Sequence, residues 1–115
     1  MKAGRLEGLM GFAARSRNLV TGYNTCLAMM GNRKIKLLII SEDVGEKTKD
    51  KMVQKCTFNN IEWRVFGKAE DLSQMTGKED KGLFGITDKG FAKSICEEID
   101  RIQSERKVSD GHESI

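Results

Sequence analysis

The run Leu37-Leu38-Ile39-Ile40 constrains the fold of this chain more than any other segment. Successive side chains of a strand point to opposite faces, and all four side chains here are aliphatic. A strand of this kind needs apolar cover on both faces, which helices provide in small α/β proteins. The run therefore predicts a buried strand over residues 37–41 and a sheet with helices on each side.

The rest of the chain alternates between helical and extended patterns. Apolar spacings of three and four predict helices, and alternation of apolar with polar residues predicts further strands. Thr21 is the expected N-cap of the second helix, and Thr87 or Asp88 that of the last. The expected helices span residues 2–16, 22–32, 46–58, 69–75 and from about 88 onward, with extended segments at 18–20, 61–66 and 83–87. These elements predict an α/β fold, a three-layer α/β/α sandwich with a small four-stranded mixed sheet.

The length of 115 residues fits one domain, expected over residues 1–107, with a flexible polar tail over residues 108–115. No apolar run approaches the ~20 residues of a membrane span, and the first residues lack a signal-peptide block. We therefore expect a cytoplasmic protein without a membrane partner.

Charge is distributed unevenly along the chain. Residues 1–36 carry seven basic side chains against Glu7 alone, a net charge of +6, whereas residues 37–115 carry 13 basic and 16 acidic side chains. A basic segment of this kind favours a polyanionic partner. The alternative is that these charges only solvate exposed helix faces.

The cysteines and the single histidine argue against most catalytic and metal sites. Cys26, Cys56 and Cys96 lie 30 and 40 residues apart among apolar neighbours, which is typical of reduced thiols that fill a core. His112 lies in the polar tail, which disfavours a histidine-centred triad or a zinc site within the domain. We expect no metal, no cofactor and no small-molecule substrate.

The adjacent carboxylates Glu42 and Asp43 are the most enzyme-like feature, because they follow the predicted central strand. Ligands of open α/β sheets often bind at the carboxyl ends of strands. Acidic residues at this position more often cap the entry to a helix, and no phosphate-binding glycine loop or nucleophile motif accompanies them. The sequence therefore predicts a protein that is not an enzyme.

The segment Gly22-Tyr23-Asn24-Thr25 opens the second predicted helix and is the best candidate for a binding site. The N-terminus of a helix presents backbone N–H groups and the positive end of the helix dipole, which favour phosphate. The Asn24 amide can both donate and accept, as recognition of a purine edge requires. Lys34 and Lys36 follow the same helix and could neutralise phosphates. Alternatively, Asn24 caps its own helix and the lysines are ordinary surface residues.

Several segments together resemble one family. The residues are Gly-Tyr-Asn-Thr at 22–25, Lys-Ile-Lys-Leu-Leu-Ile-Ile-Ser-Glu-Asp-Val at 34–44, and Thr-Gly-Lys-Glu at 76–79 followed by Gly-Ile-Thr-Asp-Lys-Gly-Phe-Ala at 85–92. Their order and spacing resemble the L-seven-Ae/L-thirty-e ribosomal-protein superfamily, in particular its small bacterial branch of YlxQ-like ribosome-associated proteins. The resemblance covers about residues 5–100.

This resemblance implies an α/β/α sandwich that binds kink-turn RNA, a bent internal loop with tandem sheared G·A pairs. Gly22 and Asn24 match the family's contacts to these pairs, whereas Thr25 stands where glutamate is usual. Lys34 and Lys36 match its Lys-x-Lys before the central strand. A second contact region would be the loop 77–82, in which Glu79 and Asp80 would repel phosphate unless neighbouring lysines dominate.

The sequence thus favours a small RNA-binding protein that associates with the ribosome or another structured RNA. The expected RNA-binding residues are Gly22, Asn24, Thr25, Lys34, Lys36, Arg15, Arg17, Lys68, Lys78 and Lys81. We expect the basic side chains of the first third to gather around the exposed start of the second helix. The competing hypothesis is a protein-interaction module of the same fold that has lost specific kink-turn binding.

Overall fold

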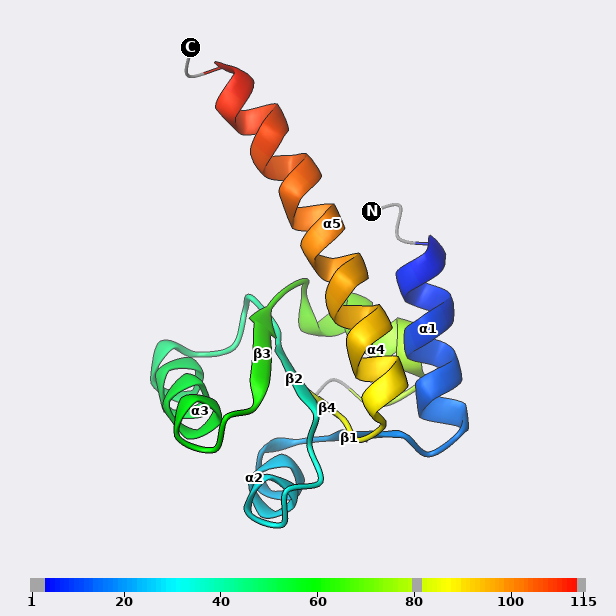
Figure 1. The fold of residues 1–115 in the computed structure, drawn as a ribbon, viewed down its shortest axis with the longest axis vertical. Coiled ribbons are helices and arrows are strands. Elements are labelled where there is room, and N and C mark those ends of the chain that lie inside the picture. The colour runs from blue at the N-terminus through cyan, green and yellow to red at the C-terminus, as the bar shows by residue number, and fades with distance from the viewer. Residues whose placement is uncertain (1–3, 80–81, 114–115) are drawn as a thin grey trace.

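The computed structural model describes residues 4–79 and 82–113, with side-chain surroundings as far as residue 106 (Figure 1). Its elements are α1 (Gly4–Arg15), β1 (Leu19–Thr21), α2 (Tyr23–Gly31), β2 (Leu37–Ile40), α3 (Glu46–Phe58), β3 (Glu62–Val65), α4 (Ala69–Thr76), β4 (Leu83–Ile86) and α5 (Lys89–Glu113). Helices and strands thus occur close to where the apolar spacing predicts them.

The four strands form one mixed sheet in the order β1-β4-β2-β3. β4 is antiparallel to both of its neighbours, and β2 is parallel to β3. All four β2 side chains are fully buried, as the aliphatic run predicts. β2 is therefore an interior strand, and the predicted mixed sheet is confirmed.

The sheet lies between two helical layers. Leu37 and Ile39 pack into a core with α1, α4 and α5, whereas Leu38 and Ile40 pack into a second core with α2 and α3. The alternation of one strand's side chains between two separate cores confirms the three-layer α/β/α sandwich. Cys26 and Cys56 are buried in the second core, as expected.

The ends of the strands define two opposite edges of this sheet. At the carboxyl edge β1, β2 and β3 end and β4 begins, since Thr21 pairs with Phe84 and Ile40 with Leu83. At the opposite edge, the amino edge, β1, β2 and β3 begin and β4 ends. α2 and α3 each start at the carboxyl edge and end at the amino edge, so the two helices run in the same direction.

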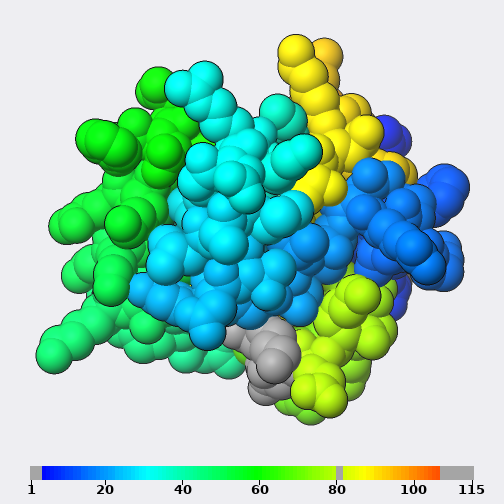
Figure 2. All heavy atoms as spheres, turned by 90° about the horizontal axis from the view of Figure 1, so that it is seen from below, coloured from blue at the N-terminus to red at the C-terminus, as the bar shows by residue number. Residues whose placement is uncertain are grey.

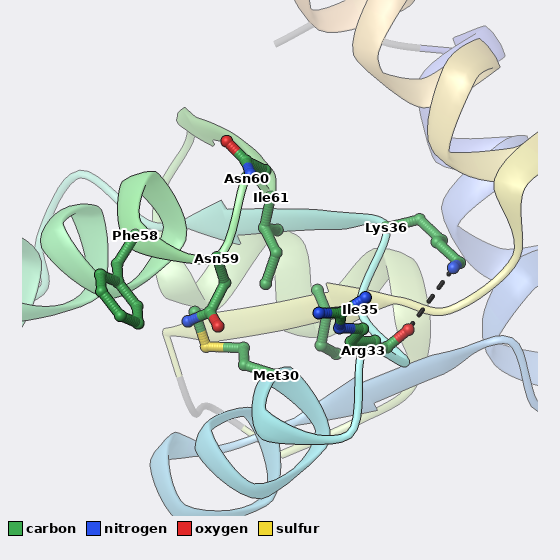
Figure 3. A pocket seen from close by; sticks show the side chains of 8 residues that line it. All are labelled: Met30, Arg33, Ile35, Lys36, Phe58, Asn59, Asn60 and Ile61. Carbon is green, nitrogen blue, oxygen red and sulfur yellow. Dashed lines mark hydrogen bonds between the residues drawn. The ribbon is translucent and has the colours of Figure 1, made fainter.

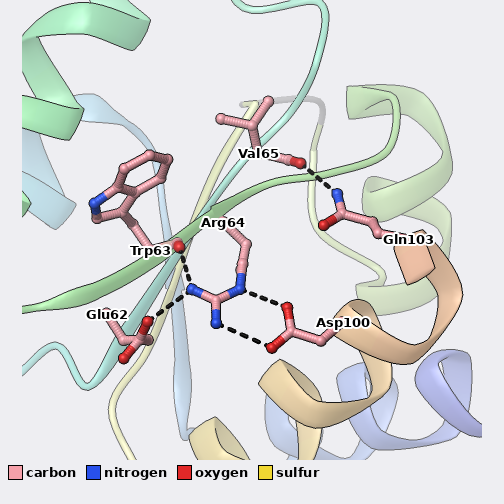
Figure 4. Close-up of polar contacts among 6 residues, drawn as sticks. All are labelled: Glu62, Trp63, Arg64, Val65, Asp100 and Gln103. Atoms are coloured by element: carbon pink, nitrogen blue, oxygen red, sulfur yellow. Dashed lines mark hydrogen bonds and ion pairs between the residues drawn. The ribbon is translucent and has the colours of Figure 1, made fainter. Parts of the chain in front are cut away.

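Arg64 joins the edge strand β3 to α5 (Figure 4). Its guanidinium donates to both carboxylate oxygens of Asp100, at 2.7 and 3.0 Å, and to Glu62 at 2.7 Å. The hydrogen bonds to Asp100 raise the pKa of Arg64 and lower the pKa of the Asp100 carboxyl. Gln103 on the same helix donates to the Val65 carbonyl at 2.8 Å. These contacts hold the middle of α5 against β3.

Two predicted helix boundaries differ from the structure. Gly22, not Thr21, is the N-cap of α2, because Thr21 is paired with Phe84 in β1. α5 continues as a helix to Glu113 and so extends into the segment 108–115. The flexibility of that segment stays a prediction. Asp88 caps α5 as expected, accepting a hydrogen bond from the Phe91 N–H at 2.8 Å.

Within residues 4–79 and 82–113, none of the helices is both long enough and apolar enough to cross a membrane.

Candidate nucleic-acid interface

The start of α2 is held at the carboxyl edge by Gly22. Its N–H donates to the Leu83 carbonyl at 3.1 Å, and its own carbonyl accepts from the Cys26 N–H at 3.0 Å. Gly22 has φ 96° and ψ 154°, a backbone conformation that is essentially restricted to glycine. This glycine lets the chain leave β1 and begin α2 within one residue. We call residues Gly22–Thr25 the α2 tip.

The α2 tip presents its polar side chains to solvent. Asn24 and Thr25 are both exposed, and within the described part of the chain no side chain caps this helix. The first N–H groups of a helix have no partner inside it and form the positive end of its dipole. The structure therefore leaves Asn24 available to a ligand and does not use it as the cap of its own helix.

Two further segments meet the α2 tip at this edge. The Gly82 carbonyl accepts from the Ser41 N–H at 2.9 Å, next to the Gly22–Leu83 hydrogen bond. A Cβ on Gly82 would lie 2.6 Å from the Val44 side chain, and its φ is +76°. The end of the loop before β4 and the β2–α3 connection are therefore packed together beside the tip.

A row of lysines on α3 lies beside α2. Lys51 Nζ is 5.8 Å from the centroid of the Tyr23 ring, a cation–π distance. Lys47 and Lys55 precede and follow Lys51 by four residues, so all three project from one face of α3, and all are exposed. We call these residues the lysine stripe. Figure 2 shows α2 across the middle of this face with α3 alongside.

Sequence reasoning missed the lysine stripe, although its spacing of four residues was a readable signal. Residues 1–36 carry the larger net charge, and the apolar spacing of α3 predicted only an amphipathic helix. The neighbour of Lys51 could not be read from the sequence, because Tyr23 belongs to another helix.

The predicted loop residues are placed unevenly. Lys68 is the N-cap of α4 at the carboxyl edge, and its Nζ lies 3.9 Å from a Glu42 carboxylate oxygen. Lys78 is exposed in the segment that leads to β4, next to the exposed Glu79. Lys81 and Asp80 lie outside the described residues. Lys68 therefore lies at the same edge of the sheet as the α2 tip, and the segment with Lys78 leads back to that edge, although α4 itself belongs to the opposite helical layer.

The four basic residues expected around the tip lie at the other edge. Arg15 ends α1, and Arg17 lies in the turn that leads to the start of β1. Lys34 and Lys36 follow the end of α2, and the Lys36 N–H donates to the Ile86 carbonyl at 2.7 Å, at the amino edge. A helix of nine residues, about 13 Å at 1.5 Å per residue, separates this edge from the tip. The expected gathering of these four residues around the tip is therefore wrong.

The two carboxylates after β2 have a structural task. Asp43 Oδ1 accepts from the Ala69 N–H at 3.1 Å, and Glu42 Oε2 accepts from the Gly67 N–H at 3.3 Å. The hydrogen bond from Ala69 lowers the pKa of Asp43. Asp43 thus caps α4, a helix distant in sequence, whereas a cap on the helix that follows was expected.

The comparisons with known proteins agree with this architecture. The profile of the Ribosomal protein L7Ae/L30e/S12e/Gadd45 family matches residues 4–96. The chain belongs to this family, as its sequence motifs indicated.

Two curated relatives carry the same name. The RNA-binding protein YlxQ of Enterococcus faecium is 38% identical over 93 residues, which cover 80% of this chain and 88% of the relative. The RNA-binding protein YlxQ of Bacillus subtilis (strain 168) is 28% identical over 92 residues, covering 80% and 92%.

Two solved structures share the fold. A protein with unknown function from Bacillus halodurans C has a TM-score of 0.81 and 34% identity, over 86% of this chain and 99% of that chain. The Giardia lamblia 15.5kD RNA binding protein has a TM-score of 0.69 and 15% identity, over 87% and 85%.

Proposed function

We propose that this protein binds structured RNA at the α2 tip and is not an enzyme. Family membership and the two relatives named as RNA-binding proteins support the class of ligand. The observation that carries the proposal is an exposed Asn24 on a helix start that no described side chain caps. The carboxylates that suggested catalysis are engaged with backbone N–H groups.

The tip offers two kinds of contact to RNA. Its N–H groups and the helix dipole suit a phosphate, while the Asn24 amide can pair with the edge of an exposed purine. The lysine stripe, Lys68 and Lys78 add positive charge around it, which attracts the RNA backbone. RNA-binding proteins commonly recognise bent or unpaired regions of an RNA, because the deep, narrow major groove of a regular RNA helix excludes side chains.

We further propose that the preferred RNA contains a kink-turn and that the protein associates with the ribosome in the cytoplasm. The match of Gly22 and Asn24 to the family motif supports this specificity. The basic residues of the amino edge would then contact RNA arms that extend beyond the kink, and not the G·A pairs themselves.

Titration of a fluorescent kink-turn hairpin tests this proposal. Loss of a bidentate base contact costs about 1–3 kcal/mol, so Asn24→Ala should weaken binding roughly 5- to 150-fold. Asn32→Ala is the matched control, because Asn32 is also exposed but lies at the opposite end of α2. Affinity should also fall steeply between two salt concentrations.

A hairpin with its G·A pairs replaced should bind more weakly than the kink-turn hairpin. Equal affinities for the two hairpins would refute kink-turn specificity. If Asn24→Ala and the double variant Lys34→Ala/Lys36→Ala both left ribosome association intact, a protein-interaction module would replace the RNA hypothesis.

A further inference from the structure

A second surface feature lies about 13 Å from the tip, at the amino edge, where α2 and α3 end. Here a pocket of about 440 Å³ opens between the last turns of the two helices (Figure 3). Met30, Ile35 and Ile61 are buried and form an apolar floor, while Arg33 and Phe58 are exposed. Lys36 also lines the pocket, and none of its eight described lining residues is a carboxylate. The pocket therefore combines apolar surface with positive charge.

Phe58 gives this pocket an aromatic face. Phe58 is 85% exposed. The other exposed phenylalanine, Phe12, is 58% exposed, and its ring lies edge-on to the Phe91 ring with 5.6 Å between the ring centroids. Asn59 follows Phe58 in the lining of the pocket, and its amide nitrogen donates to the Lys55 carbonyl at 2.8 Å, which leaves the amide oxygen and one N–H for a ligand (Figure 3). An aromatic ring beside an amide is a combination that can stack a nucleobase and pair with its edge.

Arg33 occupies a backbone position that glycine usually fills. It has φ +58°, and its N–H donates to the Met30 carbonyl at 3.1 Å while the next N–H donates to the Met29 carbonyl at 2.9 Å. These are the hydrogen bonds of a Schellman motif, in which the left-handed residue is most often glycine. Arg17 and Asn60 adopt the same left-handed conformation after α1 and α3, so the place of Arg33 in the lining of the pocket, and not its backbone, points to a role for its cation.

A continuous basic face connects the pocket with the α2 tip. Lys51 lies beside Tyr23 of the tip, and Lys55 and Phe58 follow it by four and seven residues on the same face of α3. Lys51, Lys55 and Phe58 also line a common concavity. An RNA strand that leaves the tip could therefore cross two lysines before it reaches the pocket.

We propose that this pocket binds one unstacked nucleotide of the same RNA, in a single-stranded extension next to the structured part. The base stacks on Phe58 with its edge at Asn59, and Arg33 and Lys36 hold the flanking phosphates. At ~3.4 Å per nucleotide, about four nucleotides span the distance from the tip. This inference rests on the proposed RNA-binding function and adds a second site to it.

The test compares a blunt kink-turn hairpin with the same hairpin carrying six unpaired uridines at either end in turn. Wild-type protein should bind one extended RNA about tenfold more tightly than the blunt RNA. Phe58→Ala should remove that gain, a loss of about tenfold that lies within the range of about 1–3 kcal/mol for the stacking of one base, and leave blunt binding unchanged. Because Phe58 is exposed, this variant should fold normally.

Two further variants make the result specific. Phe12→Ala removes an exposed phenylalanine from the opposite helical layer and should leave all affinities unchanged. Arg33→Gly places glycine, which adopts the left-handed conformation readily, at this position. The urea concentration at its unfolding midpoint should therefore equal or exceed that of wild type, while its binding of the extended RNA should weaken.

Binding of the blunt RNA reports on the proposed function, and the gain from the extension reports on the pocket. Blunt binding without any gain, or a gain that survives Phe58→Ala, overturns the pocket proposal alone. Failure of wild-type protein to bind either RNA overturns both proposals.

Discussion

Thr25 is the residue at which this α2 tip departs from the motif of the family it resembles. The usual glutamate would accept from a guanine with a full charge, whereas a threonine hydroxyl is shorter and neutral. Both residue types suit the first turn of a helix, so the difference concerns the ligand and not the fold. The residue at position 25 should therefore affect how strongly the protein prefers RNA with an accessible guanine.

We predict that Thr25→Glu strengthens binding to a hairpin with sheared G·A pairs by about five- to tenfold. A charge-assisted hydrogen bond is roughly twice as strong as a neutral one. The same substitution should weaken binding to a hairpin without G·A pairs, because the added charge repels phosphate. Parallel titrations of the two hairpins measure both effects, with Thr25→Gln as the uncharged control. Weaker binding to both hairpins would contradict guanine recognition at this position.

Among the elements, local sequence patterns predicted most boundaries because their signals are local. The aliphatic run of β2, the spacing of the α3 apolar residues and the Asp88 cap of α5 each depend on neighbours in sequence. Thr21 was assigned wrongly because its pairing with Phe84 in β1 takes precedence over capping.

The grouping of the site residues could not be predicted in the same way. The strand order β1-β4-β2-β3 determines which loops meet at each edge, and no short segment encodes it. It places Lys34 and Lys36 a helix length from Asn24, although all three belong to one basic segment. The exposed start of α2 was predictable, since Gly22-Tyr23-Asn24-Thr25 is itself a local motif.

The Asp43 cap of α4 gives a prediction on stability. Asp43→Ala should unfold at lower urea concentration than wild type at pH 7, because the Ala69 N–H loses its acceptor. The pKa of Asp43 is lowered in the folded state, so its contribution is complete above the ordinary carboxyl pKa of about 4. The contribution is lost as the pH falls through the lowered value.

Urea denaturation from pH 7 down to about pH 2 measures this dependence, and the two midpoints should converge at the acid end. Asp43→Asn is the control, since it keeps an acceptor but does not titrate. A difference between Asp43→Ala and wild type that stayed constant over this range would contradict a role for the ionised carboxylate.

For the whole molecule, the sandwich places most of the proposed binding residues in one helical layer and the larger core in the other. α2 and α3 carry the tip, the lysine stripe and the pocket, while α1, α4 and α5 bury the larger of the two cores. Arg64 and Gln103 hold α5 against the sheet in the layer of α1, α4 and α5. The exposed side chains of α2 and α3 can therefore change with little cost to the fold.

Titration of ¹⁵N-labelled protein with the kink-turn hairpin, followed by the chemical shift of each amide, locates the bound RNA on the protein. The proposed site is the carboxyl edge, at the start of α2. We predict that the largest changes in chemical shift occur at Tyr23, Asn24 and Thr25, with smaller changes along the lysine stripe. Unchanged amides at the α2 tip, with changes confined to α1 and α5 instead, would contradict it.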